Sequence, residues 1–271
     1  MPKIASRPVV LTIAGSDSGG GAGVQADLKT FAAFGVHGAS AIACLTAQNP
    51  RRVLAIESCS PSMLRRQIEA VFEELHPAAV KTGMLFSSEN LQVVAGFFRA
   101  WVARPPVSLI VDPVMVSTSG AKLLKPVAIK VLKEQLLPRA TLVTPNLQEA
   151  EVLTGEKIAS VENMRAATRE IHARFGCAVL VKGGHLRRMR KAVDIFFDGR
   201  TELLLTAPFI KGIRTHGTGC TYSAAIAAAL ALGRDLPQAV ALAKNYITQA
   251  IARSYRVERH AVLNHLGRTN D

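Results

Sequence analysis

The chain has 271 residues, 49% of them hydrophobic, and its 33 Lys and Arg against 20 Asp and Glu give a formal net charge of +13. That length and apolar content allow a large buried core, so the sequence excludes a disordered chain and predicts one globular α/β domain, or two at most. No run of about 18 apolar residues is present, which excludes a transmembrane helix and argues against a membrane partner.

The basic excess makes nucleic acid the first partner to consider, because clustered Lys and Arg supply most of the sequence-independent affinity for phosphate backbones. Here the charges are scattered, and the only dense run is Arg187-Arg188-Met189-Arg190-Lys191. Only 5% of the residues are aromatic, so no platform for base stacking is evident. We therefore expect no nucleic-acid partner. We interpret the run as a solvated loop between two strands, with a basic flap over a phosphate-bearing ligand as the alternative.

Cysteine usage indicates the compartment. Cys44, Cys59, Cys177 and Cys220 show neither metal-ligand spacing nor the density of a disulfide scaffold, which predicts a cytoplasmic protein. The apolar segment at 7–15 ends before it reaches the length of a secretory signal, so we interpret it as a first strand.

Strand-like and helix-like segments alternate along the chain. The expected strands cover residues 8–14, 37–45, 79–82, 107–111, 141–144 and 177–181. Apolar residues at helical spacing predict helices around 24–31, 64–75 and 91–98, with two later helices at 219–232 and 237–254. This order predicts a mostly parallel sheet covered by helices on both faces.

The last part of the chain is less regular. Residues 192–197 and 202–206 are typical of a hairpin across Asp198-Gly199. After Tyr255 the sequence turns polar and charged. We expect residues 256–271 to form a tail that frays or packs loosely, outside a single core of about 8–255.

Functional groups follow the expected strands, at the edge where open α/β sheets bind ligands. The first is the glycine-rich loop 15–23, whose backbone can approach a ligand closely. Residues 21–26 match the loose dinucleotide fingerprint G-x-G-x-x-A, but no acidic residue lies between Leu28 and Ile56 to bind a ribose. A nicotinamide-dependent dehydrogenase is therefore disfavoured.

Carboxylates and a capping pattern follow the next two strands. Asp112 comes directly after an apolar strand, where it can hold magnesium or its waters, or cap a turn. Asn146 and Glu149 predict a capping box at the start of a helix. The same spacing brings both side chains to one side of the first turn, so they too can serve hydrated magnesium.

Two further motifs suit phosphate. Lys182 precedes Gly183-Gly184 at a strand end, where it can reach a phosphate as a point charge or stay a surface lysine. The run 217–220 (Gly-Thr-Gly-Cys) leads into an apolar helix, and such a start forms an anion hole. Cys220 lies in the first turn, where a thiol ionises more easily and can act as a base. The alternative is a helix cap with a structural cysteine.

Together these motifs resemble those of the ribokinase-fold kinases. More narrowly, residues 14–30, 46–49, 81–85 and 216–221 resemble the hydroxymethylpyrimidine and phosphomethylpyrimidine kinases of thiamine biosynthesis. The resemblance covers about residues 8–255 and is specific, because cysteine stands where most ribokinase-fold enzymes carry an aspartate base. It implies a three-layer α/β/α ribokinase-like fold with a mostly parallel central sheet.

The resemblance also implies roles for individual residues. Gln48 binds the edge of the aminopyrimidine, and Cys220 takes the proton from the substrate hydroxyl. The residues that shape the ring pocket are Asp27, Gly15, Ala22, Met84 and Val114. The amides around Gly217, Thr218 and Gly219 hold the transferred phosphoryl group, and Lys182 meets ATP phosphates. The residues that organise Mg²⁺ are Asp112, Asn146 and Glu149.

The implied reaction is phosphorylation by ATP, first of the hydroxymethyl group and then of the resulting monophosphate, in a cytoplasmic homodimer. Two segments depart from the family pattern, 211–214 and the basic run 187–191, both near the expected ATP side. A pyridoxal kinase of the same fold is the nearest alternative, although Gln48 and Met84 favour the pyrimidine. A non-catalytic nucleotide- or nucleic-acid-binding protein is the alternative from a different class.

Overall fold

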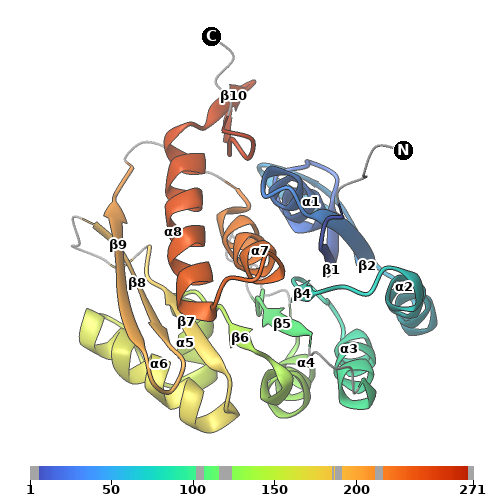
Figure 1. Ribbon diagram of the computed structural model, residues 1–271, viewed down its shortest axis with the longest axis horizontal. Helices are drawn as coiled ribbons and strands as arrows, with labels where there is room; N and C mark the ends of the chain where they lie inside the picture. The colour runs from blue at the N-terminus through green and yellow to red at the C-terminus, as the bar shows by residue number, and fades with distance from the viewer. Residues whose placement is uncertain are drawn as a thin grey trace.

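The computed structural model describes residues 6–101, 107–115, 124–184, 186, 191–210 and 216–267. A nine-stranded sheet crosses the molecule in the order β3-β2-β1-β4-β5-β6-β7-β8-β9 (Figure 1). Its strands are β1 (Val9–Asp17), β2 (His37–Asn49), β3 (Arg52–Ser58), β4 (Ala79–Thr82), β5 (Ser108–Val111), β6 (Leu142–Val143), β7 (Ala178–Lys182), β8 (Lys191–Phe197) and β9 (Glu202–Pro208). The six strands from β2 to β7 in this order pair in parallel, whereas β3 pairs antiparallel with β2, β8 with β7, and β9 with β8. The mostly parallel α/β sheet is confirmed.

Helices cover both faces of this sheet. On one face lie α2 (Pro61–Glu74), α3 (Ser88–Ala100), α4 (Pro126–Val131), the π-helical turn η1 (Leu132–Leu136), the 3-10 turn η2 (Leu137–Arg139), α5 (Leu147–Thr154) and α6 (Val161–Phe175). On the other face lie α1 (Gly23–Ala33), α7 (Thr218–Ala231) and α8 (Leu236–Ala252). The three layers enclose one hydrophobic cluster on each side of the sheet.

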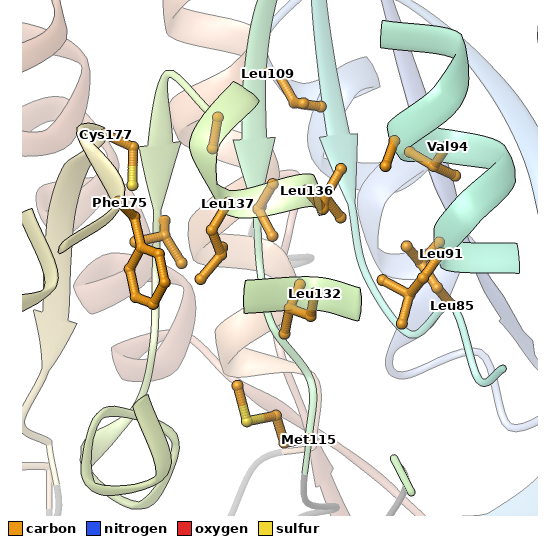
Figure 2. Packing of buried hydrophobic residues seen from close by; sticks show 14 of the residues in the cluster. Leu85, Leu91, Val94, Leu109, Met115, Leu132, Leu136, Leu137, Phe175 and Cys177 are labelled. Atoms are coloured by element: carbon orange, nitrogen blue, oxygen red, sulfur yellow. The ribbon is translucent and has the colours of Figure 1, made fainter. Parts of the chain in front are cut away.

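The first cluster shows how the elements pack. In Figure 2, Leu91 and Val94 of α3 lie near Leu136 of η1, beside Leu109 of β5. The central strands are nearly continuous runs of buried residues, and all four residues of β4 are buried, the polar Lys81 and Thr82 included. Such continuous runs are typical of parallel strands, because helices cover both of their faces.

Helix α7 lies at the centre of the second cluster. Its residues from Ala224 to Ala229 have no exposed surface, because the helix packs against α1, α8 and the strands β1, β4 and β5. A helix that is apolar on every side is a buried helix. The small alanine side chains let the neighbouring backbones approach closely, so this helix is enclosed on all sides.

The sequence predicted some element bounds poorly. Strand β2 continues to Asn49, four residues beyond the expected end, and β3 was not anticipated. Helix α6 was not anticipated either, although its sequence carries both end signals. The Ser160 hydroxyl caps its start, and Gly176 ends it with a positive φ of 75°.

The expectation of a loosely packed tail after Tyr255 is wrong for the residues that the structure describes there. Strands β10 (Tyr255–Val257) and β11 (His260–Val262) form a hairpin, and Leu263 and His265 are buried. The Tyr246 hydroxyl donates to the His265 carbonyl oxygen at 2.8 Å, and the His265 Nε2 lies 3.1 Å from the Thr221 Oγ1. A few buried side chains therefore fasten a segment that is polar in composition.

Two of the sequence expectations lie outside the described residues. These are the basic residues 187–190 and the departure at 211–214, whereas Lys191 begins β8 and is exposed. Within the described part of the chain, no helix combines the length and the apolar character needed to cross a bilayer.

Candidate active site

The functional groups meet at the carboxyl edge of the parallel strands. Asp17 ends β1, Lys182 ends β7, and Asp112 directly follows β5. Asn146 forms a bridge with Lys182, which brings the strand-to-helix turn after β6 to the same edge. The structure thus gathers the predicted junctions at the place where parallel sheets bind ligands.

The glycine-rich loop and the start of α7 lie back to back. Gly217 caps α7 with a φ of 84°, and a Cβ there would collide with the carbonyl oxygen of Gly21. Gly23 begins α1 with a φ of 56°, and a Cβ there would collide with the carbonyl oxygen of Gly15. Both positions need glycine for its left-handed backbone and for the close approach. The loop therefore lies directly against the expected phosphate site.

Cys220 lies in the first turn of α7 and keeps some exposed surface. Burial raises the pKa of its thiol to about 11, and the positive charge of Lys81 and a backbone hydrogen bond from Gly23 offset only part of that rise. The expectation of an easily ionised thiol is therefore wrong for the ligand-free protein. A helix N-terminus favours a thiolate, but here desolvation outweighs it.

Lys81 and Asp27 form a buried ion pair that the sequence did not predict. The Lys81 Nζ lies 2.8 Å from the Asp27 Oδ2, and neither side chain is exposed. The Thr12 hydroxyl donates to the same oxygen at 2.6 Å, and Asp27 Oδ1 has no hydrogen-bond partner among the described residues. Although burial favours the neutral amine, the charge of Asp27 raises the pKa of Lys81. Asp27 thus lies beneath the surface of the site and not on its lining.

The other residues expected around the ring lie beside the glycine-rich loop or at the next strand ends. A Cβ on Gly15 would lie 3.7 Å from the Met84 carbonyl oxygen, and the Ala22 N–H donates to Asp17 at 2.7 Å. The Ser18 hydroxyl bonds both the N–H and the carbonyl of Gln48, each at 2.8 Å.

Val114 follows β5 with a φ of 43°, a conformation that is costly for a β-branched residue. Strain of this kind is often found at functional sites. The unusual backbone of Val114 is therefore consistent with a role at this edge of the sheet.

Lys182 and Asp112 reach the start of α7 from the other side. The Lys182 Nζ lies 2.9 Å from the Asp112 Oδ1, and both side chains are largely buried. A Cβ on Gly219 would lie 3.3 Å from the Lys182 Nζ and 3.7 Å from the Asp112 Oδ2. Lys182 is therefore not a surface lysine, and it lies next to the anion-hole motif.

The capping box is confirmed at the start of α5. The Glu149 N–H donates to the Asn146 Oδ1 and the Asn146 N–H donates to the Glu149 Oε2, both at 2.9 Å. Burial, followed by the negative charge of Asp112, raises the pKa of Glu149 to about 7. Two acidic groups thus repel each other across a site that holds the ammonium group of Lys182.

This donor set fits a hydrated magnesium ion. Mg²⁺ keeps several waters and is held through one or two carboxylates together with substrate phosphates. The carboxylates of Asp112 and Glu149 meet that requirement, and a cation would relieve their repulsion. The described residues contain no group of three His, Cys, Asp or Glu side chains that could hold a metal alone.

Sequence reasoning gave no role to Asp17 or His216. Asp17 Oδ1 accepts the Gly19 N–H at 2.7 Å, and its Oδ2 accepts the Gly21 N–H at 3.0 Å. Its Oδ2 also lies 3.3 Å from the His216 Nε2. Burial opposes ionisation, but hydrogen bonds from His216, from Gln48 and from the loop amides hold the pKa of Asp17 well below its usual range. The position of Asp17 at the end of the first strand was the sequence signal that could have identified it.

Comparison with known proteins gives consistent matches. A family profile described as phosphomethylpyrimidine kinase matches residues 17–265. A hydroxymethylpyrimidine/phosphomethylpyrimidine kinase of Rhizobium meliloti is 51% identical over 251 residues, which cover 92% of each chain. A phosphomethylpyrimidine kinase of Clostridium difficile is 44% identical, with a TM-score of 0.80 over 90% of this chain and all of that one. A Bacillus subtilis pyridoxal kinase, solved as an ADP complex, is 35% identical, with a TM-score of 0.86 over 96% and 98%.

Proposed function

Because the chain belongs to the phosphomethylpyrimidine kinase family, we propose that it transfers the γ-phosphoryl group of ATP to 4-amino-5-hydroxymethyl-2-methylpyrimidine, and then a second one to the resulting monophosphate. The product is the diphosphate used in thiamine biosynthesis. The observation that carries the proposal is the start of α7, which has the glycine-rich loop on one side and the pair of Lys182 and Asp112 on the other.

The glycine-rich loop forms the ring side of the proposed site. Gln48 is partly exposed there, so its amide can donate to and accept from the edge of an aminopyrimidine. The Gly15 backbone lies against the Met84 carbonyl oxygen, and we assign both residues to the ring pocket. The remaining ring-side residues are Ala22 and Val114, with Asp27 supporting them from below.

Cys220 is the proposed base of the first step. Its thiolate removes the proton of the substrate hydroxyl, and the hydroxyl oxygen bonds the γ-phosphorus as the bond from that phosphorus to the β–γ bridging oxygen breaks, which releases ADP. A base with a raised pKa is strong but is seldom ionised, so Lys81 assists by its positive charge near the thiolate. In the second step the nucleophile is a phosphate that already carries negative charge.

The phosphate side acts chiefly by position and charge, as phosphoryl transfer requires. The amides of Gly217, Thr218 and Gly219 at the helix start bind the transferred group, and Lys182 neutralises ATP oxygens. Asp112, Asn146 and Glu149 would hold Mg²⁺, which when bound neutralises phosphate charge.

An ADP-release assay tests this function. The purified protein with ATP and Mg²⁺ is offered hydroxymethylpyrimidine, its monophosphate and pyridoxal in parallel. We expect turnover of both pyrimidines at a higher kcat/KM than that of pyridoxal. Pyridoxal is the natural rival because the pyridoxal kinase structure is so similar. A higher kcat/KM for pyridoxal would contradict the proposed substrate, and no turnover of any of the three would contradict the proposed activity.

We further propose a cytoplasmic homodimer. All four cysteines are free, which suits a reducing compartment. The edge strand β3 and its neighbour β2 expose apolar side chains, with Leu45 at 55% and Leu54 at 60% exposure. Such a surface suits association with a second copy. Light scattering would give the mass of the particle, and Leu54→Lys is expected to shift it towards the monomer.

A further inference from the structure

We propose that Asp17 is a positioning residue that fixes the ring-binding side of the site and the phosphate-binding start of α7 relative to each other, with His216 as the link. This inference rests on the proposed function, because it concerns the distance between the acceptor oxygen and the transferred phosphoryl group. Asp17 touches neither substrate in this role, and it acts through the backbone and side chains that it holds.

The carboxylate of Asp17 organises the glycine-rich loop from inside. The residue is only 3% exposed. Besides the Gly19 and Gly21 amides, its Oδ2 accepts the Ala22 N–H at 2.7 Å. An ionised carboxylate accepts stronger hydrogen bonds than a neutral group does. These bonds tie three backbone amides of the loop to one carboxylate.

The same carboxylate reaches beyond the loop in two directions. His216 Nε2 lies 3.3 Å from Asp17 Oδ2, and the imidazole packs on Gly21, where a Cβ would lie 3.2 Å from the His216 Cδ2. His216 immediately precedes Gly217, the cap of α7. In the other direction, the side chain of Gln48 lies close enough to help lower the pKa of Asp17, and the hydroxyl of Ser18, the next residue in the chain, bonds the Gln48 backbone. One charged group therefore lies beside the proposed ring-recognition residue and the residue before the phosphate loop.

The C-terminal hairpin comes close to this contact. A cavity of about 30 Å³ is lined by Asp17 and His216 together with Ala261 and Val262 of β11. Phosphoryl transfer needs the acceptor oxygen and the phosphate at close distance, and a misplacement of about 1 Å can cost about 100-fold in rate. A residue that connects both sides is well placed to set that distance.

The His216→Ala variant distinguishes a positioning role of His216 from a purely structural one. His216→Ala leaves the loop bonds to Asp17 in place and removes only the link to α7. We expect kcat to fall by about 10- to 100-fold, while the dissociation constant for the pyrimidine changes less than about threefold, a difference of under 1 kcal/mol. His216→Gln keeps a donor at this position and is expected to recover part of kcat.

A double-mutant cycle with Asp17→Asn tests the coupling. Asn keeps the size of the side chain but loses its charge, so we expect a weaker pyrimidine affinity as well as a lower kcat. His216→Ala should cost less in the Asp17→Asn background than in the wild type, because the link is already weakened. Independent effects, equal in both backgrounds, would overturn the proposal. So would a His216→Ala enzyme with wild-type kcat.

Asp198→Asn is the matched control. Asp198 is also a carboxylate that accepts two backbone N–H groups, those of Arg200 and Thr201, but it lies in the β8–β9 turn. Phe197 pairs with Val179 near the start of β7, at the end opposite the site. This variant should lose stability without losing kcat. If Asp17→Asn does not fold, His216→Ala and His216→Gln decide the question alone. All rates are compared with those of the wild type, measured on the acceptor that the wild type phosphorylates. An error in the proposed substrate and an absence of coupling between Asp17 and His216 therefore give different results.

Discussion

Lys81 of β4 and Asp27 of α1 form an ion pair with no exposed surface, 2.8 Å between Nζ and Oδ2. Helix α7, which carries Cys220, packs on both of these elements. A buried pair gains little net stability, because desolvation opposes the attraction. Its charges also act on the thiol, which Lys81 stabilises in its ionised form and Asp27 destabilises. The pair thus links the stability of the fold to the chemistry of the base.

Removing one partner should be costly. Lys81→Met leaves an uncompensated carboxylate in the interior, and we expect a loss of about 3–5 kcal/mol in the free energy of unfolding. The double variant with Asp27→Asn should lose less, since it buries no charge. Urea unfolding monitored by circular dichroism measures both. A single variant as stable as the double one would contradict the ion pair.

Replacing the base should affect turnover and spare binding. Cys220→Ser puts a weaker base at the start of α7, and we expect the rate of the first phosphorylation to fall by about 10² to 10⁴. Pyrimidine affinity, measured by calorimetry, should stay close to that of the wild type. The second step should be less sensitive, because its phosphate nucleophile is already charged. Unchanged turnover of the hydroxymethyl substrate would exclude Cys220 as the base.

The thiol should react slowly in the ligand-free enzyme. A pKa of about 11 leaves Cys220 as the thiol at neutral pH, and alkylation requires the thiolate. At pH 8 we expect iodoacetamide to label it about a hundredfold more slowly than it labels the same cysteine in unfolded protein. Labelling should rise as the pH approaches 11. Peptide-resolved mass spectrometry separates it from the other cysteines, and rapid labelling at pH 7 would contradict the raised pKa.

Gln48 should affect ring affinity. Gln48→Leu keeps similar bulk but removes the amide, and leaving a polar partner unsatisfied costs about 1–3 kcal/mol. The dissociation constant for the pyrimidine should therefore rise by about tenfold or more. The KM for ATP should change little, because Lys182 and the start of α7 are unaltered. Equal pyrimidine affinity in calorimetry would make Gln48 a structural residue.

His265 should make the fold sensitive to mild acid. Burial, assisted by the charge of Lys29, lowers its pKa to about 4 from an ordinary 6.5. Between these values the unfolded chain binds a proton that the folded chain does not, so stability falls as the pH is lowered. The loss between pH 7 and pH 5 should be about 2 kcal/mol. His265→Gln should reduce this slope in urea unfolding at the two pH values, and an unchanged slope would contradict the assignment.

Much of the fold follows from local patterns. Strands such as β5 and β7 are short, largely apolar runs that alternate with helical patterns along the chain, and this order predicted a parallel sheet before any contact was known. Strand β3 escaped prediction because nearly all of its residues are exposed, so no alternation marks it. The C-terminal segment escaped because its composition is polar, although Leu263 and His265 are buried.

The residues of the candidate site also fall into those that local patterns located and those that they did not. Asp112, Lys182 and the Asn146 cap could be located because each follows a strand, and parallel strands end at a common edge. The pair of Asp27 and Lys81 spans 54 residues and depends on how α1 packs on the sheet, which no local pattern specifies. The thiol pKa of Cys220 likewise depends on burial, and a motif specifies only the helix start.

Helix α7 has a consequence for directed evolution. The six residues from Ala224 to Ala229 are fully buried, and added bulk in a packed core costs about 1–3 kcal/mol. A larger side chain there displaces the helix together with Cys220, so it changes the rate without touching a substrate. Selection for new acceptor alcohols should therefore accumulate substitutions along the exposed end of β2, where side chains are not packed in the core. Most variants from a library that randomises α7 should be inactive.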